Sequence, residues 1–200
     1  MEKAYNKYFE KNMHIIDNSL KTIDKDAFEK LINDCVRVIR SGNKIIASGL
    51  GKNVAVCEKF AGTMISLGMN AFFLNTNSAV HGDMGIIRPG DLLILLSKSG
   101  STQESIYFYN LIKERKGVTI WLLSYENSSP LAQSIDNKII INLDHEGDMW
   151  NIIPNNSTTI NLIVLQELAI ELSRKLNMSL EKDFKPNHPG GKIGELLRNE

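Results

Sequence analysis

A buried-strand pattern that runs straight into a hydroxyl-rich loop constrains this chain more than any other feature. The apolar run at 93–96 predicts a buried strand. It is followed by Ser97, Ser99 and Thr102 around one glycine, and a helical pattern begins at once. Such a corner offers backbone N–H groups, hydroxyl groups and a helix N-terminus to one point, which suits a phosphate. Glu104, in the first turn of that helix, would place a carboxylate beside the group that carries the phosphate.

Apolar strand patterns alternate with helical patterns along the whole chain. The strands are predicted at 44–48, 71–74, 92–96, 118–123 and 138–142. Helices are predicted at 3–22, 24–41, 53–67 and 103–115, followed by a short helix that begins at about 130 and a long helix that begins near 157 and ends at about 176. This alternation predicts an α/β fold, namely a three-layer α/β/α sandwich with a five-stranded parallel sheet. We expect one domain over 1–200, with N-terminal helices within 1–41 and a C-terminal tail at 185–200.

Three unusual loops each follow a predicted strand. They are 49–52, 75–85 and 97–102, and the second is expected to have no regular structure. In an open parallel sheet, ligands bind outside the carboxyl ends of the strands where the strand order reverses. We therefore expect these loops to gather at one edge of the sheet. Asp24 is the predicted N-cap of the second helix, and the Ser-Thr-Thr run at 157–159 that of the last long helix.

Composition excludes several classes of function. The formal net charge is zero, so no basic surface for nucleic acid is indicated. Cys35 and Cys57 lie in helical, partly apolar patterns and are predicted to be buried free thiols in a reducing compartment. The polar N-terminus has no signal-peptide pattern, and no apolar run is long enough to span a membrane. We expect a cytoplasmic protein without nucleic-acid or membrane partners.

The Gly49-Leu50-Gly51-Lys52 turn invites two nucleotide-binding interpretations, and both fail. A dinucleotide fingerprint needs Gly or Ala where this chain has Val54, and a P-loop needs Ser or Thr where it has Asn53. Two interpretations remain open for the turn itself. It is either an ordinary tight turn with a solvated lysine, or a turn that holds Lys52 over the strand ends.

Three further segments carry titratable residues that signal little individually. His81 lies in a long loop beside an acid, where a structural role or a chance metal site is more common than catalysis. Glu146 follows the fifth strand in an acidic loop that is typical of solvated surface. His188 precedes Pro-Gly-Gly, so the proline holds it extended before a tight turn. A structural interpretation of that tail carries about the same weight as a functional one.

Taken together, these segments resemble the sugar isomerase (SIS) family. The Ser97–Thr102 loop matches the phosphate loop of that family. Four more motifs resemble its arabinose-5-phosphate isomerase members: Gly-Leu-Gly-Lys at 49–52, the 79–85 segment with His-Gly-Asp, the 154–159 segment with Ser-Thr-Thr, and His-Pro-Gly-Gly at 188–191. The resemblance covers nearly the whole chain. Many such members carry a paired regulatory module after His-Pro-Gly-Gly, so the chain resembles the short form.

The resemblance implies an aldose–ketose isomerase that interconverts D-ribulose 5-phosphate and D-arabinose 5-phosphate. It also implies a homo-oligomer, a tetramer, with no obligatory metal or other cofactor. The implied catalytic residues are Lys52, Glu104, Glu146 and His188, and the substrate-binding residues are Gly51, His81, Ser97, Lys98, Ser99, Ser101 and Thr102. This sequence departs from the family at 75–78, where a His and an acid are usual, and at Lys98, where an Asn is usual.

Isomerisation through an enediolate assigns a role to each of these groups. The hydroxyl loop holds the phosphate, and its binding energy orients the reacting carbons. Glu104 or Glu146 takes the carbon proton, and the sequence does not choose between them. His188 moves the proton between oxygens, from its own or a neighbouring subunit, and Lys52 stabilises the enediolate charge.

Three alternatives remain at this stage. The substrate is a hexulose or heptulose phosphate in the first, because the 75–78 segment differs from the family pattern. The second is a non-catalytic sugar-phosphate-binding regulator, which predicts missing catalytic acids. The third is a purely structural α/β domain, which the hydroxyl loop disfavours.

Overall fold

The computed structural model describes residues 4–198 of the chain. The first three residues of the predicted N-terminal region and the last two of the predicted tail lie outside the described residues. Five parallel strands form one sheet in the order β2-β1-β3-β4-β5. The strands are β1 (Ile45–Gly49), β2 (Ala71–Asn75), β3 (Leu92–Leu96), β4 (Thr119–Ser124) and β5 (Lys138–Ile140). The predicted three-layer sandwich is confirmed.

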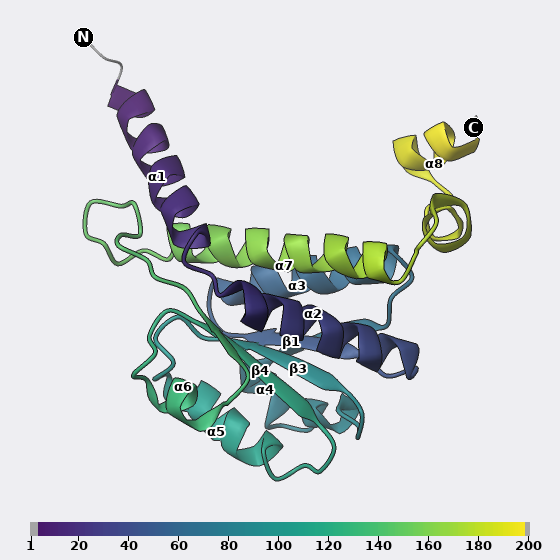
Figure 1. The fold of residues 1–200 in the computed structure, drawn as a ribbon, viewed down its shortest axis with the longest axis horizontal. Coiled ribbons are helices and arrows are strands. Elements are labelled where there is room, and N and C mark those ends of the chain that lie inside the picture. Colours follow the sequence, from purple (N-terminus) through teal and green to yellow (C-terminus); the bar gives the residue numbers. More distant parts are fainter. Residues whose placement is uncertain (1–3, 199–200) are drawn as a thin grey trace.

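Helices cover both faces of the sheet (Figure 1). On one face lie α2 (Lys25–Arg40), α3 (Asn53–Ser66) and α7 (Asn156–Lys175), and on the other α4 (Thr76–Ala79), α5 (Gln103–Ile112) and α6 (Pro130–Ser134). Strand β3 shows how the sequence directs this packing. Leu92, Ile94 and Leu96 join the core under α2, α3 and α7, whereas Leu93 and Leu95 join the core under α5 and α6. Successive strand residues point to opposite faces, so an unbroken apolar run specifies a central, doubly covered strand.

Local sequence signals fix several helix ends. Asp24 caps α2 as predicted, because its carboxylate accepts hydrogen bonds from the N–H groups of Asp26 and Ala27. Ser129 caps α6 in the same way, accepting from the N–H of Ala132. The predicted free thiols are also confirmed, since Cys35 and Cys57 are both buried and unpaired. These features depend only on neighbouring residues or on an apolar pattern, so the sequence alone is enough to predict them.

Some predicted boundaries were wrong. The 75–85 segment is not irregular but contains α4 and a short 3-10 turn at Asp83–Ile86. The Asn75 side chain accepts a hydrogen bond from the N–H of Asn77 and starts α4 as soon as β2 ends. The helix predicted to reach 115 ends at Ile112, and the fifth strand ends at Ile140.

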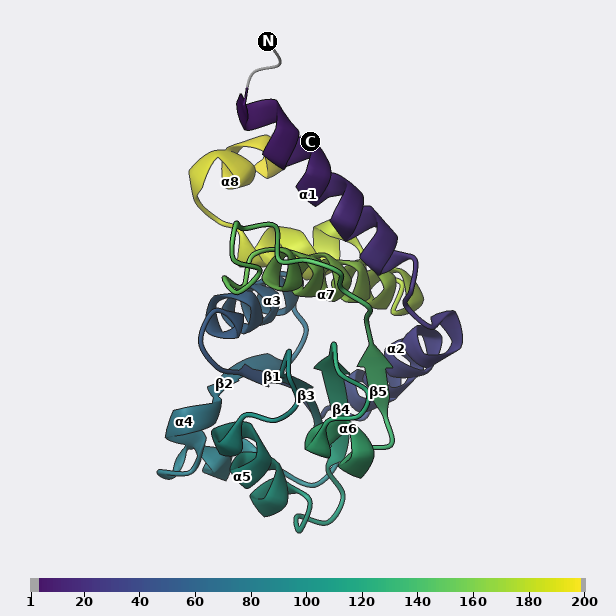
Figure 2. The ribbon, with the colours of Figure 1, turned by 90° about the vertical axis from the view of Figure 1, so that its left-hand side faces the viewer.

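Two segments extend beyond the sandwich on its α7 side (Figures 1 and 2). The first is α1 (Ala4–Leu20), which leaves Tyr8, Phe9 and Met13 more than half exposed. The second is the tail, with short helical turns at Leu180–Phe184 and Lys185–Asn187 and then α8 (Gly191–Arg198). Within residues 4–198, no helix combines the length and the apolar character needed to cross a bilayer.

Candidate active site

A pocket of about 300 Å³ lies at the carboxyl ends of β1 and β3. These two strands are neighbours, and Gly49 pairs with Leu96, so the loops that follow them start level with each other. This is the point where the strand order reverses, as the sequence predicts. The lining residues are Leu50, Gly51, Lys52, Asn53, Leu96, Ser97, Lys98, Ser99, Thr102, Ser105, Pro154, Ser157 and Thr158.

The backbone of the hydroxyl loop is held firmly in place. The carbonyl oxygen of Lys98 accepts hydrogen bonds from the N–H of Tyr125 and the hydroxyl of Ser124, both at 3.1 Å. Gly100 has φ +58°, and a Cβ there would lie 2.0 Å from Oγ of Ser129. Only glycine fits this position without strain. The loop is therefore preformed for a ligand.

Three helix N-termini converge on this pocket. Helix α3 contributes Asn53, α5 contributes Ser105, and α7 contributes Ser157 and Thr158. Each N-terminus carries a partial positive charge, although at α7 the N–H groups of Asn155 and Ser157 already bind the Glu146 carboxylate. The pocket is lined in addition by the side chain of Lys52. This arrangement suits a small anion such as a phosphate monoester.

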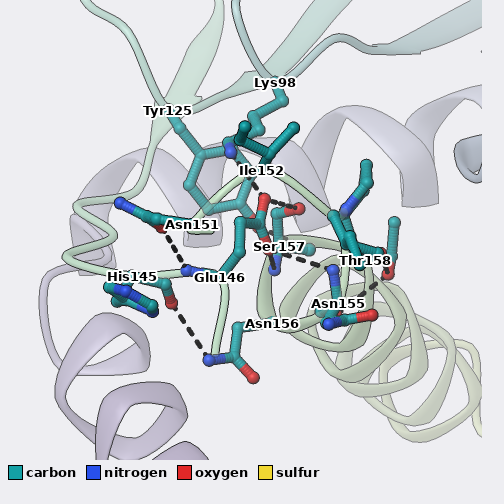
Figure 3. Close-up of polar contacts among 12 residues, drawn as sticks. Lys98, Tyr125, His145, Glu146, Asn151, Ile152, Asn155, Asn156, Ser157 and Thr158 are labelled. Carbon is teal, nitrogen blue, oxygen red and sulfur yellow. Dashed lines mark hydrogen bonds and ion pairs between the residues drawn. The ribbon is translucent and has the colours of Figure 1, made fainter. Parts of the chain in front are cut away.

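Glu146 is fully buried, and its side chain lies beside Lys98 and Ser157, two residues of the pocket lining (Figure 3). Its Oε1 receives the Ser157 hydroxyl at 2.6 Å and the Lys98 ammonium group at 2.6 Å. Its Oε2 receives the N–H groups of Ser157 at 2.9 Å and of Asn155 at 3.1 Å. The predicted cap of the last helix by the 157–159 hydroxyls is therefore wrong: a carboxylate from the preceding loop takes the free N–H groups instead.

The charge state of Glu146 follows from these contacts. Burial alone raises the pKa of the Glu146 carboxyl, but the hydrogen bonds from Lys98 and Ser157 outweigh it, and the pKa lies below its ordinary value. The neighbouring Tyr125 donates its hydroxyl to the carbonyl of Ser157 and to Asn161. Burial, and then the negative charge of Glu146, raise the pKa of Tyr125. Glu146 is thus an ionised carboxylate with Lys98 as its countercharge.

Besides Glu146 and His188, three predicted site residues do not line this pocket. Glu104 is exposed in the first turn of α5, and His81 is exposed in the loop after α4. Ser101 turns back on its own loop, because its hydroxyl donates to the carbonyl of Ser99. The roles assigned to these three residues therefore stay predictions.

His188 is far from the pocket of its own chain. Asn187 donates its side-chain amide to the carbonyl of Ser66, at the C-terminal end of α3, whereas Asn53 lines the pocket at the N-terminal end. A helix of 14 residues separates these ends by about 20 Å. The His188 ring stacks on Phe184 with 3.8 Å between ring centroids, and Nδ1 lies 2.9 Å from the Phe184 carbonyl oxygen. A role for His188 in catalysis therefore requires a second subunit.

Sequence reasoning missed four polar residues of the lining. They are Asn53, Ser105, Ser157 and Thr158. All four lie in the first turn of a helix that begins at the strand ends. The argument applied to Thr102 and Glu104 in α5 also applies to the helices that begin near 53 and 156, and it would have found them.

Two other features bear on what this site can hold. Among the described residues, no three His, Cys, Asp or Glu side chains are grouped so as to hold a metal ion. A larger groove of about 570 Å³ lies elsewhere, with Ile23 and Phe28 on one side and Ile163 of α7 on the other. Its lining has no hydroxyl side chain, and only one helix, α2, begins there, whereas three begin at the smaller pocket.

The fold and this anion pocket define the class of protein. Residues 38–170 match the model of the SIS domain, so the chain belongs to the SIS domain family. It is 33% identical to arabinose 5-phosphate isomerase KdsD of Pseudomonas aeruginosa, over 93% of this chain and 60% of the relative. It is 32% identical to arabinose 5-phosphate isomerase KpsF of Escherichia coli, over 91% of this chain and 56% of the relative. The chain thus spans somewhat more than half the length of these curated relatives.

Solved structures agree with this assignment. A putative phosphosugar isomerase involved in capsule formation from Bacteroides fragilis superposes with a TM-score of 0.86 at 26% identity, covering 94% of this chain and 99% of the other. The E. coli CFT073 protein c3406, solved in complex with arabinose 5-phosphate, superposes with a TM-score of 0.83 at 27% identity, covering 91% and 94%.

Proposed function

We propose that this chain is an aldose–ketose isomerase that interconverts D-arabinose 5-phosphate and D-ribulose 5-phosphate. The observation that carries the proposal is the preformed anion pocket of Ser97, Ser99 and Thr102, with Lys52 in its lining and the buried carboxylate of Glu146 beside its lining residues. The names of the curated relatives and the arabinose 5-phosphate bound to the structural neighbour support this sugar phosphate.

The reaction needs one base, one proton carrier and stabilisation of an oxyanion. In the proposed mechanism the loop hydroxyls and helix N-termini bind the phosphate and orient the sugar. Glu146 accepts the proton on carbon; the electron pair of that C–H bond forms the C=C bond of the enediolate, and the carbonyl π pair moves to oxygen. Lys52 stabilises this oxygen. The neighbouring hydroxyl then gives up its proton and the former carbonyl oxygen gains one, a transfer carried out by His188, while Glu146 returns its proton to the former carbonyl carbon. Glu146 is preferred to Glu104 because its carboxylate bonds to Ser157 and Lys98 of the pocket lining, whereas Glu104 is exposed.

We further infer that His188 acts in the pocket of a second copy within a homo-oligomer, as the family resemblance suggests for a tetramer. The distance between His188 and its own pocket supports this, since the length of α3 separates them. Exposed apolar residues on α1 and α8, namely Tyr8, Phe9, Met13, Ile193 and Leu196, supply surface that a second copy would cover. The two buried free thiols are consistent with a cytoplasmic location.

Incubation of the purified protein with D-arabinose 5-phosphate, followed by measurement of ketose formation, tests the proposed activity. A parallel panel contains hexulose and heptulose phosphates. We expect turnover to be fastest with the pentose phosphate. Binding of sugar phosphates without turnover of any would favour a regulator instead, and faster turnover of a longer sugar would reassign the substrate.

A further inference from the structure

Lys98 occupies an unusual position between two anion sites. Its ammonium group forms an ion pair with Glu146 at 2.6 Å (Figure 3). Lys98 also lines the anion pocket, together with Ser99 and Thr102. It is the one charged residue of the 97–102 loop, whose other members are hydroxyl residues and a glycine. The question is which anion holds the ammonium group when the pocket is filled.

The backbone of Lys98 is fixed, but its side chain is free to change partner. The carbonyl of Lys98 is held by Ser124 and Tyr125, whereas its side chain is 41% exposed. A lysine side chain has a flexible four-carbon stem and a rotatable ammonium group, unlike the rigid fork of arginine. Movement of Nζ from Glu146 into the pocket therefore needs only side-chain rotation.

The two anions compete for this group on unequal terms. Glu146 carries one negative charge and keeps three other donors, the Ser157 hydroxyl and the N–H groups of Ser157 and Asn155, after Lys98 departs. A phosphate monoester carries about −1.5 to −2 charges at neutral pH and three acceptor oxygens. The incoming phosphate is thus the stronger partner, and the carboxylate it leaves behind is still hydrogen-bonded.

Accordingly, we propose that Lys98 is a positioning residue that blocks the Glu146 carboxylate in the empty pocket and releases it when a phosphate group draws the ammonium group away. This proposal rests on the isomerase function proposed above, with Glu146 as the base. Loss of its cationic partner raises the proton affinity of a carboxylate and makes it a better base. The freed oxygen Oε1 is the one that accepts the carbon proton. Glu146 is therefore free to act as the base when a phosphorylated sugar is bound, and it stays paired with Lys98 when a sugar without phosphate is bound.

The release of Glu146 by phosphate can be tested by supplying the sugar and the phosphate as separate molecules. Turnover of D-arabinose is measured without and with inorganic phosphate at a pH of about 8, where phosphate is a dianion. The proteins compared are the wild type, Lys98→Met, Lys98→Arg and Lys116→Met. Lys116 is exposed in the turn between α5 and β4 and controls for simple removal of one lysine charge. Turnover of D-arabinose 5-phosphate by the wild type is measured alongside.

We expect inorganic phosphate to raise wild-type turnover of D-arabinose by about tenfold or more, the effect of roughly one unit in the pKa of the base. Lys98→Met should turn over D-arabinose about tenfold faster than the wild type without phosphate, with less than a twofold response to added phosphate. Lys98→Arg should show a smaller phosphate response than the wild type, because the guanidinium fork binds a carboxylate through two hydrogen bonds. Lys116→Met should match the wild type.

The opposite results separate two kinds of failure. If the wild type isomerises D-arabinose 5-phosphate but Lys98→Met shows no gain on phosphate-free D-arabinose, Lys98 is only a phosphate ligand or a structural partner, and the release of Glu146 by phosphate is overturned. A fall in that rate overturns it as well. If the wild type does not isomerise D-arabinose 5-phosphate, the proposed function itself fails, and the proposed release of Glu146 fails with it.

Discussion

The proposed catalytic groups are divided between two regions of the molecule. We call the N-terminal ends of α3 and α7 the complete end, and the C-terminal end of α3 with the tail the incomplete end. At the N-terminal ends, one chain supplies a finished anion pocket, with a preformed loop, three helix N-termini and a buried carboxylate that has four donors. At the C-terminal end of α3, the tail holds the His188 ring against Phe184. One chain therefore contains every group of the proposed phosphate pocket, whereas His188, the proposed second proton carrier, lies at the other end of α3.

Substitution of Glu146 gives the largest expected effect and tests the complete end. Glu146→Gln should lower kcat by about 10²–10⁴-fold, the usual contribution of a general base. It should also lower the free energy of unfolding by about 1–3 kcal/mol, because an amide nitrogen faces donors that a carboxylate accepted. Enzyme assays and urea unfolding measure the two effects.

The matched variant is Glu104→Gln. Glu104 is exposed, so its substitution should leave the free energy of unfolding unchanged. A loss of turnover in Glu104→Gln would mean that Glu104 reaches a pocket in the assembled oligomer. Full turnover in Glu146→Gln would remove Glu146 from the mechanism.

Mixed oligomers test the incomplete end. His188→Ala should lower turnover by about 10²-fold or more, as expected for loss of an acid–base group, while Lys52→Ala disables the pocket itself. Because His188 is proposed to act in a second copy, co-refolded mixtures of these two inactive variants should regain part of the wild-type activity. Co-refolding of each variant with itself is the control. Absence of any recovery in stable mixed oligomers would contradict a site shared between chains.

A change in the loop that holds the phosphate has a smaller expected effect. Gly100→Ala places a Cβ against Oγ of Ser129, which caps α6, and it also strains a backbone with φ +58°. We expect a loss of about 1–3 kcal/mol in unfolding free energy and a higher KM for the sugar phosphate. Gly62→Ala is the matched control, since its Cβ meets no atom within 4 Å and it lies inside α3. An unchanged KM in Gly100→Ala would show that the loop tolerates distortion.

The sequence predicted the features of the complete end that depend on neighbouring residues. The apolar run of β3, the loop from Ser97 to Thr102 and the start of α5 are adjacent in the chain, so composition and spacing were sufficient. The position of the pocket at the carboxyl ends of the strands followed from the general rule for parallel sheets, whereas the order of the strands was not predicted and comes from the structure. The glycine turn before Lys52 was left open, and the structure places it in the pocket lining.

Other features depend on contacts between distant segments. The ion pair between Lys98 and Glu146 joins the loop after β3 to an irregular loop after β5, and no periodic pattern specifies their approach. The Ser157 hydroxyl looks like a helix cap in the sequence, but the distant carboxylate takes that role. The position of His188 depends on how the tail packs against the end of α3, which its own sequence does not encode.

The pH dependence of stability gives the smallest expected effect and reports the ion pair directly. The pKa of Glu146 in the folded chain lies below its ordinary value of 4.5. The unfolded state therefore binds the proton more tightly, so the stabilisation from Glu146 is fully present above about pH 5 and is lost as the pH falls through the folded pKa. Urea unfolding between pH 7 and pH 3 should show a steeper loss for the wild type than for Glu146→Gln. Lys98→Met should fall between them, because it removes the ammonium group but keeps the three donors at the start of α7. Identical slopes for the wild type and Lys98→Met would mean that these donors alone hold the carboxylate ionised, leaving Lys98 without influence on its proton affinity.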